Sequence, residues 1–424
     1  DGDDNTVIGY KAGYAVTTAA DSVFLGSEAG AAVTTGSSNV FIGALAGALS
    51  TAGIDNVAIG YGAMDAANTA GGGSDGGSEN YNIAIGTNAL GAETTGAEYC
   101  VAIGHSALIL QNADVKNTAI GGLAGAGNQL DASEGYNTFI GHDAGSNADG
   151  AESNTFIGTE AGGGGVVTGN DNVAVGRYAG YDLLGGPGNV LLGYAAGANI
   201  TTGSNNVAIG FQAMDASTTL HQNNIAIGKN ALGGNATEPS GATINSIAIG
   251  TEALLVQNNA AAINTAIGYQ AGKAISSGGF NTLIGYQTGL ALADDSENTA
   301  VGHQALAGST AGAGNTAVGA YAMDGVLTGS SNTALGKHAF GQAAGAAADN
   351  TVIGHAALYG ATHASTAGNV AIGDNAGRYY NDGGSDTAMT KAIDSIYIGH
   401  NARGIHATTA DNEIVIGHNT IGAG

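Results

Sequence analysis

Tryptophan is absent from this 424-residue sequence, and proline, cysteine and charged residues are scarce: there are 2 Pro, 1 Cys and only 10% charged residues. A single cysteine excludes an intramolecular disulfide framework. No run of 18 apolar residues occurs, so a membrane-spanning helix is not expected. Ordinary soluble domains carry roughly 25% charged residues, so the composition argues against ordinary globular domains.

Positive charge is the scarcest of all. The chain has 9 Lys and Arg against 34 Asp and Glu, a net charge of −25. Nucleic acids and anionic membrane surfaces attract basic patches and repel a chain of this kind. The sequence therefore predicts no nucleic-acid partner and no membrane insertion.

Glycine, in contrast, is abundant, with 76 residues, and it marks a repeat. Residues 264–272 read Asn-Thr-Ala-Ile-Gly-Tyr-Gln-Ala-Gly, and this pattern recurs in 23 copies, mostly spaced by 17 or 18 residues. A short fixed period that tolerates local insertions is typical of a solenoid. We expect one repeat domain over residues 1–424, with insertion loops near 61–82 and 374–395.

The columns of the repeat indicate a strand followed by a turn. An aliphatic residue always precedes the motif Gly, and Val, Ile or Thr stands two residues earlier, so both share one face of a strand. The residue between them is Ala in 13 of 23 copies and otherwise a larger apolar or aromatic residue. The Gly suits a turn with positive φ, and the Ala found three residues later in 21 copies predicts a second inward-facing segment. Helix is excluded by the frequent Gly and the lack of a 3.6-residue apolar period.

Asparagine opens the motif in 18 of 23 copies. Stacked Asn side chains at a solenoid corner can hydrogen-bond along the stack and to turn backbone groups. We therefore predict a structural ladder that includes Asn39, Asn56, Asn206, Asn264, Asn281, Asn298, Asn315 and Asn332. Cys100 occupies the same column and is interpreted as a small residue of this ladder rather than as a reactive thiol.

A solenoid with rungs of this length encloses a thin core, and both faces of its strand are apolar. One face fills the interior, and the other needs cover, most simply from partner chains. The sequence thus predicts a homotrimeric rod. With a rung spacing of about 4.8 Å, its length would be on the order of 110 Å.

The unit Asn-x-Ala-Ile-Gly-x-x-Ala resembles the head repeats of YadA-like trimeric autotransporter adhesins. The returns at residues 34–39 and 201–206, Thr-Thr-Gly-Ser-Ser-Asn and Thr-Thr-Gly-Ser-Asn-Asn, look more like phage tail fibre repeats. Residues 395–402 and 412–419 look like the distal part of such fibres. The resemblance implies a left-handed parallel β-roll, three chains side by side, and a tip or chaperone segment beyond the repeats.

Histidines follow the motif Gly in several rungs, in a column shared with tyrosines. They are His105, His142, His303, His355, His400 and His418. His400 and His418 lie on adjacent rungs and could stack or share a metal, but an outward ladder of flat side chains is the simpler interpretation.

Acidic loops are candidates for Ca²⁺ or for glycan cleavage. The Ca²⁺ candidates are Asp1, Asp3 and Asp4, then Asp294, Asp295 and Glu297, and the insertions with Asp75 and Glu79 or Asp382 and Asp386. The carboxylate pairs for glycan cleavage are Asp294 with Glu297 and Asp382 with Asp386. Solvated loop acids explain them more simply, and thin rungs leave little room for a catalytic cleft. We expect no catalytic residue, no metal and no cofactor. Ice binding by the Thr column is a further alternative, weakened by its admixture of Val and Ile.

The insertion around residues 378–392 holds Tyr379, Tyr380 and Asn381, side chains of a kind that can stack on sugars. The sequence thus favours an extracellular or virion protein, the shaft of a phage tail fibre that presents a recognition element for a cell-surface glycan or receptor. Alternatives are a bacterial surface adhesin, an extracellular filament subunit and a glycan-degrading tailspike.

Overall fold

A computed structural model of the chain describes residues 2–65, 80–92, 97–110, 116–127, 135–215, 221–234, 244–257, 262–310, 312–325, 328–343, 345–361, 366–381, 386–388, 392–404 and 410–421. The contacts divide the chain into an N-terminal unit, Asp1–Leu220, and a C-terminal unit, His221–Gly424. The expectation of one repeat domain stays a prediction.

Within the described residues of the N-terminal unit, twelve short strands form one parallel ladder in which each strand pairs with the next. Motif columns pair in register, as Val40, Phe41 and Ile42 do with Val57, Ala58 and Ile59. The strands are β1 (Thr6–Ile8), β2 (Val23–Leu25), β3 (Val40–Ile42), β4 (Val57–Ile59), β5 (Ile83–Ile85), β6 (Val101–Ile103), β7 (Thr118–Ile120), β8 (Thr138–Ile140), β9 (Thr155–Ile157), β10 (Val173–Val175), β11 (Val190–Leu192) and β12 (Val207–Ile209).

The described part of the C-terminal unit has an equivalent ladder of eleven parallel strands. These are β13 (Ile225–Ile227), β14 (Ile247–Ile249), β15 (Thr265–Ile267), β16 (Thr282–Ile284), β17 (Thr299–Val301), β18 (Thr316–Val318), β19 (Thr333–Leu335), β20 (Thr351–Ile353), β21 (Val370–Ile372), β25 (Ile396–Ile398) and β27 (Ile414–Ile416). Two short pairs accompany the ladder: antiparallel β22 (Tyr379–Asn381) with β23 (Asp386–Ala388), and parallel β24 (Ala392–Ile393) with β26 (Ala410–Asp411).

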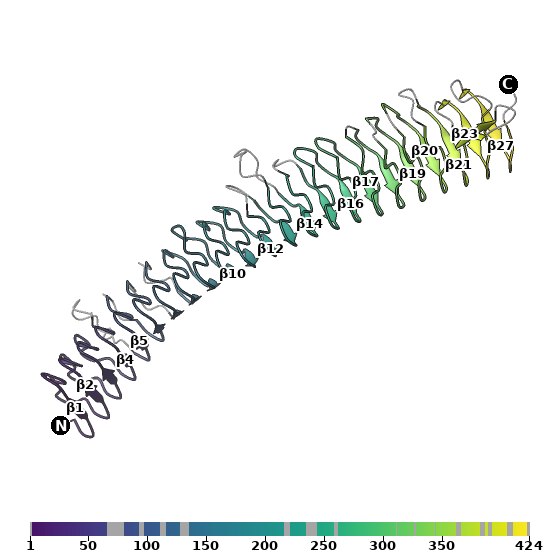
Figure 1. Ribbon diagram of the computed structural model, residues 1–424. Coiled ribbons are helices and arrows are strands. Elements are labelled where there is room, and N and C mark those ends of the chain that lie inside the picture. The colour runs from purple at the N-terminus through teal and green to yellow at the C-terminus, as the bar shows by residue number, and fades with distance from the viewer. Residues whose placement is uncertain are drawn as a thin grey trace. The chain divides into compact units, whose positions relative to one another are not determined.

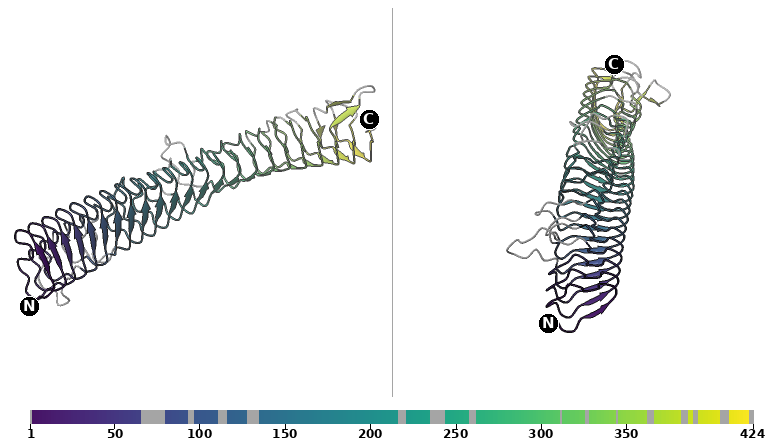
Figure 2. Two further views of the ribbon diagram at one scale, coloured as in Figure 1. Left: turned by 60° about the horizontal axis from the view of Figure 1, so that its bottom comes forward. Right: turned by 90° about the vertical axis from the view of Figure 1, so that its left-hand side faces the viewer.

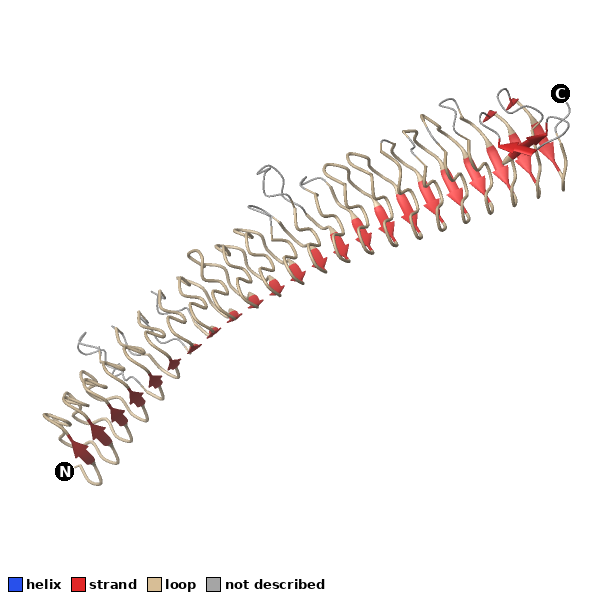
Figure 3. Ribbon diagram, in the orientation of Figure 1, coloured by secondary structure: helices blue, strands red, loops and turns tan. Residues whose placement is uncertain are grey.

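In both units the strands line one side of the coil and turns complete each rung (Figure 1, Figure 2). The described residues contain strands and loops but no helix (Figure 3), and hence no helix that could span a membrane. The predicted all-β parallel β-solenoid is therefore confirmed.

In every strand of the two parallel ladders except β1, the middle residue is buried inside the coil. Ala58 is fully buried, whereas its neighbours Val57 and Ile59 are only half-buried on the outer face. The Ala three residues after the motif Gly is also buried, as in Ala63, and so is the residue after it, Met64. The core is thus filled by the strand centre and the first turn, as the second inward segment of the motif predicted.

Side-chain volume is shared between these two inward positions. Where the strand centre is Phe41, the turn position is Gly47, and a Cβ built there would lie 2.5 Å from the Phe41 ring. Where the centre is Ala58 or Ala84, the turn position holds Met64 or Leu90, both buried. Protein interiors are closely packed, so a large group at one of the two positions favours a small group at the other. Each of these rungs therefore receives one large side chain from one position or the other.

Candidate functional site

Buried asparagines connect neighbouring rungs through hydrogen bonds. The Oδ1 atom of Asn39 accepts the backbone N–H of Asn56 at 3.0 Å, and its Nδ2 donates to the carbonyl of Gly53 at 2.7 Å. One side chain thus satisfies two backbone groups of the next rung that face the dry interior. All eight asparagines singled out by the sequence are buried: Asn39, Asn56, Asn206, Asn264, Asn281, Asn298, Asn315 and Asn332.

Smaller residues take this place in other rungs. The hydroxyl of Ser22 accepts the N–H of Asn39 at 3.1 Å, as an Asn oxygen would. Cys100 is fully buried, and its N–H donates to Oδ1 of Asn82 at 2.9 Å. The environment of Cys100 is therefore that of a packed structural position.

We expect Asn39→Ala to lower the free energy of unfolding of the surrounding rungs by about 3 kcal/mol, because each buried backbone group without a partner costs roughly 1–3 kcal/mol. Asn39→Ser should recover part of this loss, since a hydroxyl can accept the N–H of Asn56 as Ser22 accepts that of Asn39. Thermal melting and amide hydrogen exchange at residues 53–57 measure both variants. Equal stability of Asn39→Ala and the parent would contradict this role.

The predicted recognition loop is only partly described. Tyr379, Tyr380 and Asn381 form β22, which pairs antiparallel with β23 within the predicted insertion. The side chains of these three residues lie outside the described part, as do residues 66–79 of the other insertion. Their role in recognition stays a prediction.

Asp294 and Asp295, two of the candidate acids of the C-terminal unit, contact neighbouring rungs, whereas Asp382 and the side chain of Asp386 lie outside the described residues. Asp294 accepts hydrogen bonds from Ser276 (2.7 Å) and Ser277 (2.6 Å), which lower its carboxyl pKa. Burial raises the pKa of the adjacent Asp295. Among the described residues, no group of three or more His, Cys, Asp or Glu side chains could hold a metal ion. These contacts are those of loop acids that fix one rung to the next.

Rings in the column after the motif Gly stack along the C-terminal unit. Tyr269, Tyr286 and His303 lie with ring centroids 5.2 and 5.1 Å apart, nearly parallel. Further on, His355 Nδ1 lies 2.8 Å from an Asp374 carboxylate oxygen, and the rings of His400 and His418 are 5.0 Å apart. Tyr269, Tyr286 and His303 therefore stack face to face, whereas the rings of His400 and His418 are tilted by 53°.

Next to this stack runs a ladder of amides that sequence reasoning missed. Gln287 Nε2 donates to Gln270 Oε1 at 2.9 Å, and Gln304 Nε2 donates to Gln287 Oε1 at 2.8 Å. The sequence contains the pattern that indicates this amide ladder, because Gln recurs two residues after the motif Gly in three successive rungs.

The outer face of the strand ladder is a regular surface that continues from rung to rung in each unit. Its two columns contain only Thr, Val, Ile and Leu, with no charged residue in any rung. Several of its side chains are well exposed, including Leu25 at 40% and Leu192 at 44% in the N-terminal unit. Contiguous exposed apolar surfaces of this extent are uncommon on monomeric soluble proteins.

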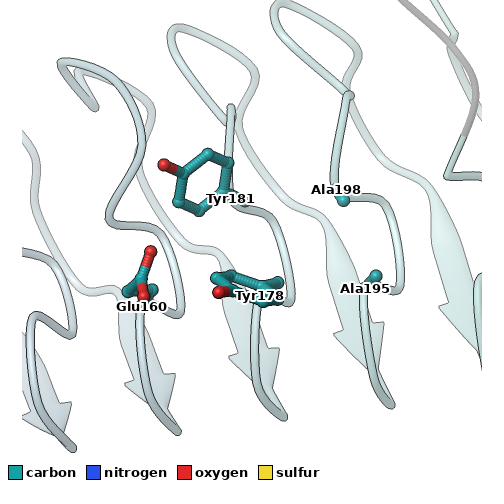
Figure 4. Close-up of a pocket in the computed structure, with 5 residues that line it drawn as sticks. All are labelled: Glu160, Tyr178, Tyr181, Ala195 and Ala198. Atoms are coloured by element: carbon teal, nitrogen blue, oxygen red, sulfur yellow. The ribbon is translucent and has the colours of Figure 1, made fainter.

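A notch opens on the side of the N-terminal unit, over three neighbouring rungs (Figure 4). It has a volume of about 340 Å³ and is lined by Glu160, Tyr178, Tyr181, Ala195 and Ala198. The notch was not predicted from the sequence. Its signal there is a pair of tyrosines three residues apart that align with two alanines of the next rung.

Asp215 lies at the end of a turn in the N-terminal unit. Among the described carboxyl groups of this unit, its pKa is shifted the most. Burial raises its pKa to about 6, against a hydrogen bond from Gln212 that lowers it. Because the pKa is higher in the folded chain, this group contributes stability that is fully present at low pH and is lost as pH rises through about 6.

We expect Asp215→Asn to melt at a higher temperature than the parent at pH 8, because the amide avoids the cost of burying a negative charge. The difference should shrink towards pH 4, where the parent carboxyl is protonated in the fold. Thermal melts of both proteins across this range make the comparison, and a constant difference would contradict the pKa assignment.

The fold and the repeated columns define a β-solenoid repeat protein. No protein-family model matches the chain, and no curated protein sequence matches it. The architecture fits a structural, fibre-like protein.

Proposed function

We propose that this protein is the shaft of a fibre, most consistently a phage tail fibre, in which three identical chains pack through the outer faces of their strand ladders. The role is structural and adhesive, without catalysis, at an extracellular or virion location. The uncharged outer face of the ladder is the single observation on which the proposal depends.

We infer that this apolar face is covered by another surface, and the same face on a second and a third chain matches it best. Its columns repeat at the rung spacing, so the same face on another chain has the same spacing and the same apolar character. Closed symmetric assemblies bury equivalent surfaces in every chain. The resemblance of the motif to trimeric fibre repeats favours three chains.

The charges support the same arrangement. The 34 acidic residues lie outside both columns of this face, so packing the faces together buries no charge. The net charge of −25 opposes binding to nucleic acid or to an anionic membrane surface. It also favours a fibre that stays soluble.

Recognition of a host surface is assigned, within this proposal, to loops that the shaft holds outward. The hairpin with Tyr379, Tyr380 and Asn381 is the leading candidate, for a cell-surface glycan or receptor. Loops on a rigid scaffold commonly carry such contacts.

The test is the mass of the native protein in solution by light scattering, combined with negative-stain imaging. We expect a mass near three times the chain mass of 40.9 kDa, with rod-shaped particles. A folded monomer would overturn the assembly, and long filaments would indicate a polymerising surface thread instead of a shaft with a tip.

A further inference from the structure

The notch on the N-terminal unit lies outside the strand ladder and is not part of the repeated pattern of the rungs. Its walls come from Tyr178 and Tyr181 in the turn after β10. In the next rung, Ala195 and Ala198 occupy the aligned positions. The change from two rings to two methyl groups leaves the hollow that Figure 4 shows.

The two rings are held in place before any ligand arrives. The Arg177 guanidinium lies 4.5 Å from the centroid of the Tyr178 ring and donates to its hydroxyl at 2.8 Å. The rings of Tyr178 and Tyr181 meet edge to face, with centroids 5.5 Å apart and planes at 87°. Tyr181 packs closely on Gly164 of the preceding rung, where a Cβ would come within 2.5 Å of its ring. Fixed side chains lose little conformational entropy on binding.

The chemistry of the lining combines apolar rings with hydrogen-bonding groups of both kinds. Both tyrosines remain half-exposed, and Glu160 supplies a carboxylate that accepts hydrogen bonds. Arg177 and the tyrosine hydroxyls add donors at the edge of the notch. This pairing suits a ligand with an apolar face and several hydroxyl groups around its rim.

A cationic ligand fits less well. Two aromatic rings and a carboxylate can enclose an ammonium group, but the cation Arg177 already lies against Tyr178. A second positive charge would be repelled there, whereas a neutral ligand would not.

We propose that the notch formed by Glu160, Tyr178 and Tyr181 binds a pyranose residue of a glycan. The C–H face of the sugar packs on the tyrosine rings, and its hydroxyls bond to Glu160 and to the donors at the rim. The volume of about 340 Å³ lies at the small end of the roughly 300–1,000 Å³ found for ligand sites. This site goes beyond the proposed function, because it lies on the shaft and does not depend on the hairpin at residues 379–388.

Saturation-transfer NMR with the full chain tests the proposal, with the methyl glycosides of glucose, galactose, mannose and N-acetylglucosamine as probes. We expect saturation of at least one glycoside, and an affinity at least about tenfold lower in both Tyr178→Ala and Tyr181→Ala. Ala198→Gln, which places a side chain into the notch and removes none of its rings, should have the same effect.

Tyr14→Ala is the matched control, because Tyr14 occupies the position of Tyr181 in the first rung, is 77% exposed, and has Lys11 rather than a tyrosine at the position equivalent to Tyr178. It should bind as the parent does, and circular dichroism should show all variants folded. The proposal would be overturned if none of the four glycosides showed saturation transfer, or if tetramethylammonium showed it in their place. It would also be overturned if Tyr14→Ala lost as much glycoside affinity as the notch variants. Particle mass is measured separately, so failure of this site is distinguishable from failure of the fibre assembly.

Discussion

Gly121→Ala is expected to unfold the rungs around β7 and β8 locally, with a loss of about 3 kcal/mol or more. Gly121 has φ +142°, a conformation that residues with a Cβ rarely adopt, and a Cβ there would lie 2.4 Å from the carbonyl oxygen of Gly141. That oxygen belongs to the backbone of the next rung, so it can move away only if the rungs separate. The ladder bond from Gly141 N–H to the Ile120 carbonyl, 2.8 Å long, would then be disturbed. Thermal melting and hydrogen exchange at residues 118–121 and 138–141 measure the effect.

The adjacent glycine provides the control. A Cβ on Gly122 would meet only a carbon of the His142 side chain, at 3.5 Å, and its φ lies outside the left-handed region. Gly122→Ala should therefore melt within about 0.5 kcal/mol of the parent, as surface substitutions usually do. If the two variants lost equal stability, the close stacking of motif glycines could not be the reason for their recurrence.

These two glycines show how much of the fold could be predicted from the repeat. The sequence distinguishes them by column alone: Gly121 belongs to the invariant position, and Gly122 to a position shared with Tyr, His and Thr. Strand and turn glycine recur in every copy of the motif and the inward alanine in 21 of 23, so one correct alignment predicts nearly all of them.

Which side of the strand faces the core could not be predicted in the same way. Val57, Ala58 and Ile59 are all apolar. Side chains alternate between the two faces of a strand, but when both faces are apolar this alternation does not indicate which one is buried. The structure places the small Ala58 inside and the two larger residues outside, because Met64 from the turn already fills the thin core. The coupled choice of Phe41 with Gly47 was visible in the sequence, but its meaning depends on knowing that both positions point inward.

The candidate sites were harder to predict because they arise between rungs. Tyr178 and Tyr181 become the walls of a notch only because the aligned residues of the next rung are alanines. Asp294 is likewise held by two serines from the preceding rung. A single-rung motif contains no information on such neighbours, whereas an alignment of successive rungs does.

Leu25→Asp is expected to abolish assembly while leaving the single chain folded. Leu25 lies on the outer face of β2 and is 40% exposed in one chain. A carboxylate there stays in water if the chain is alone, and so costs little. In the proposed trimer the same carboxylate would be buried against apolar side chains of the other chains, without a partner, which is strongly unfavourable.

Ser27→Asp tests whether charge alone has this effect. Ser27 lies in the same rung, two residues further on and beyond the motif Gly; it is exposed and lies outside the two columns of the ladder face. Light scattering should give a single-chain mass for Leu25→Asp and the parent mass for Ser27→Asp, with parent-like circular dichroism in both. Retained assembly in Leu25→Asp would mean that the outer face of the ladder is not the contact surface. A loss of assembly in both variants would point to charge repulsion between chains that already carry 34 acidic residues each.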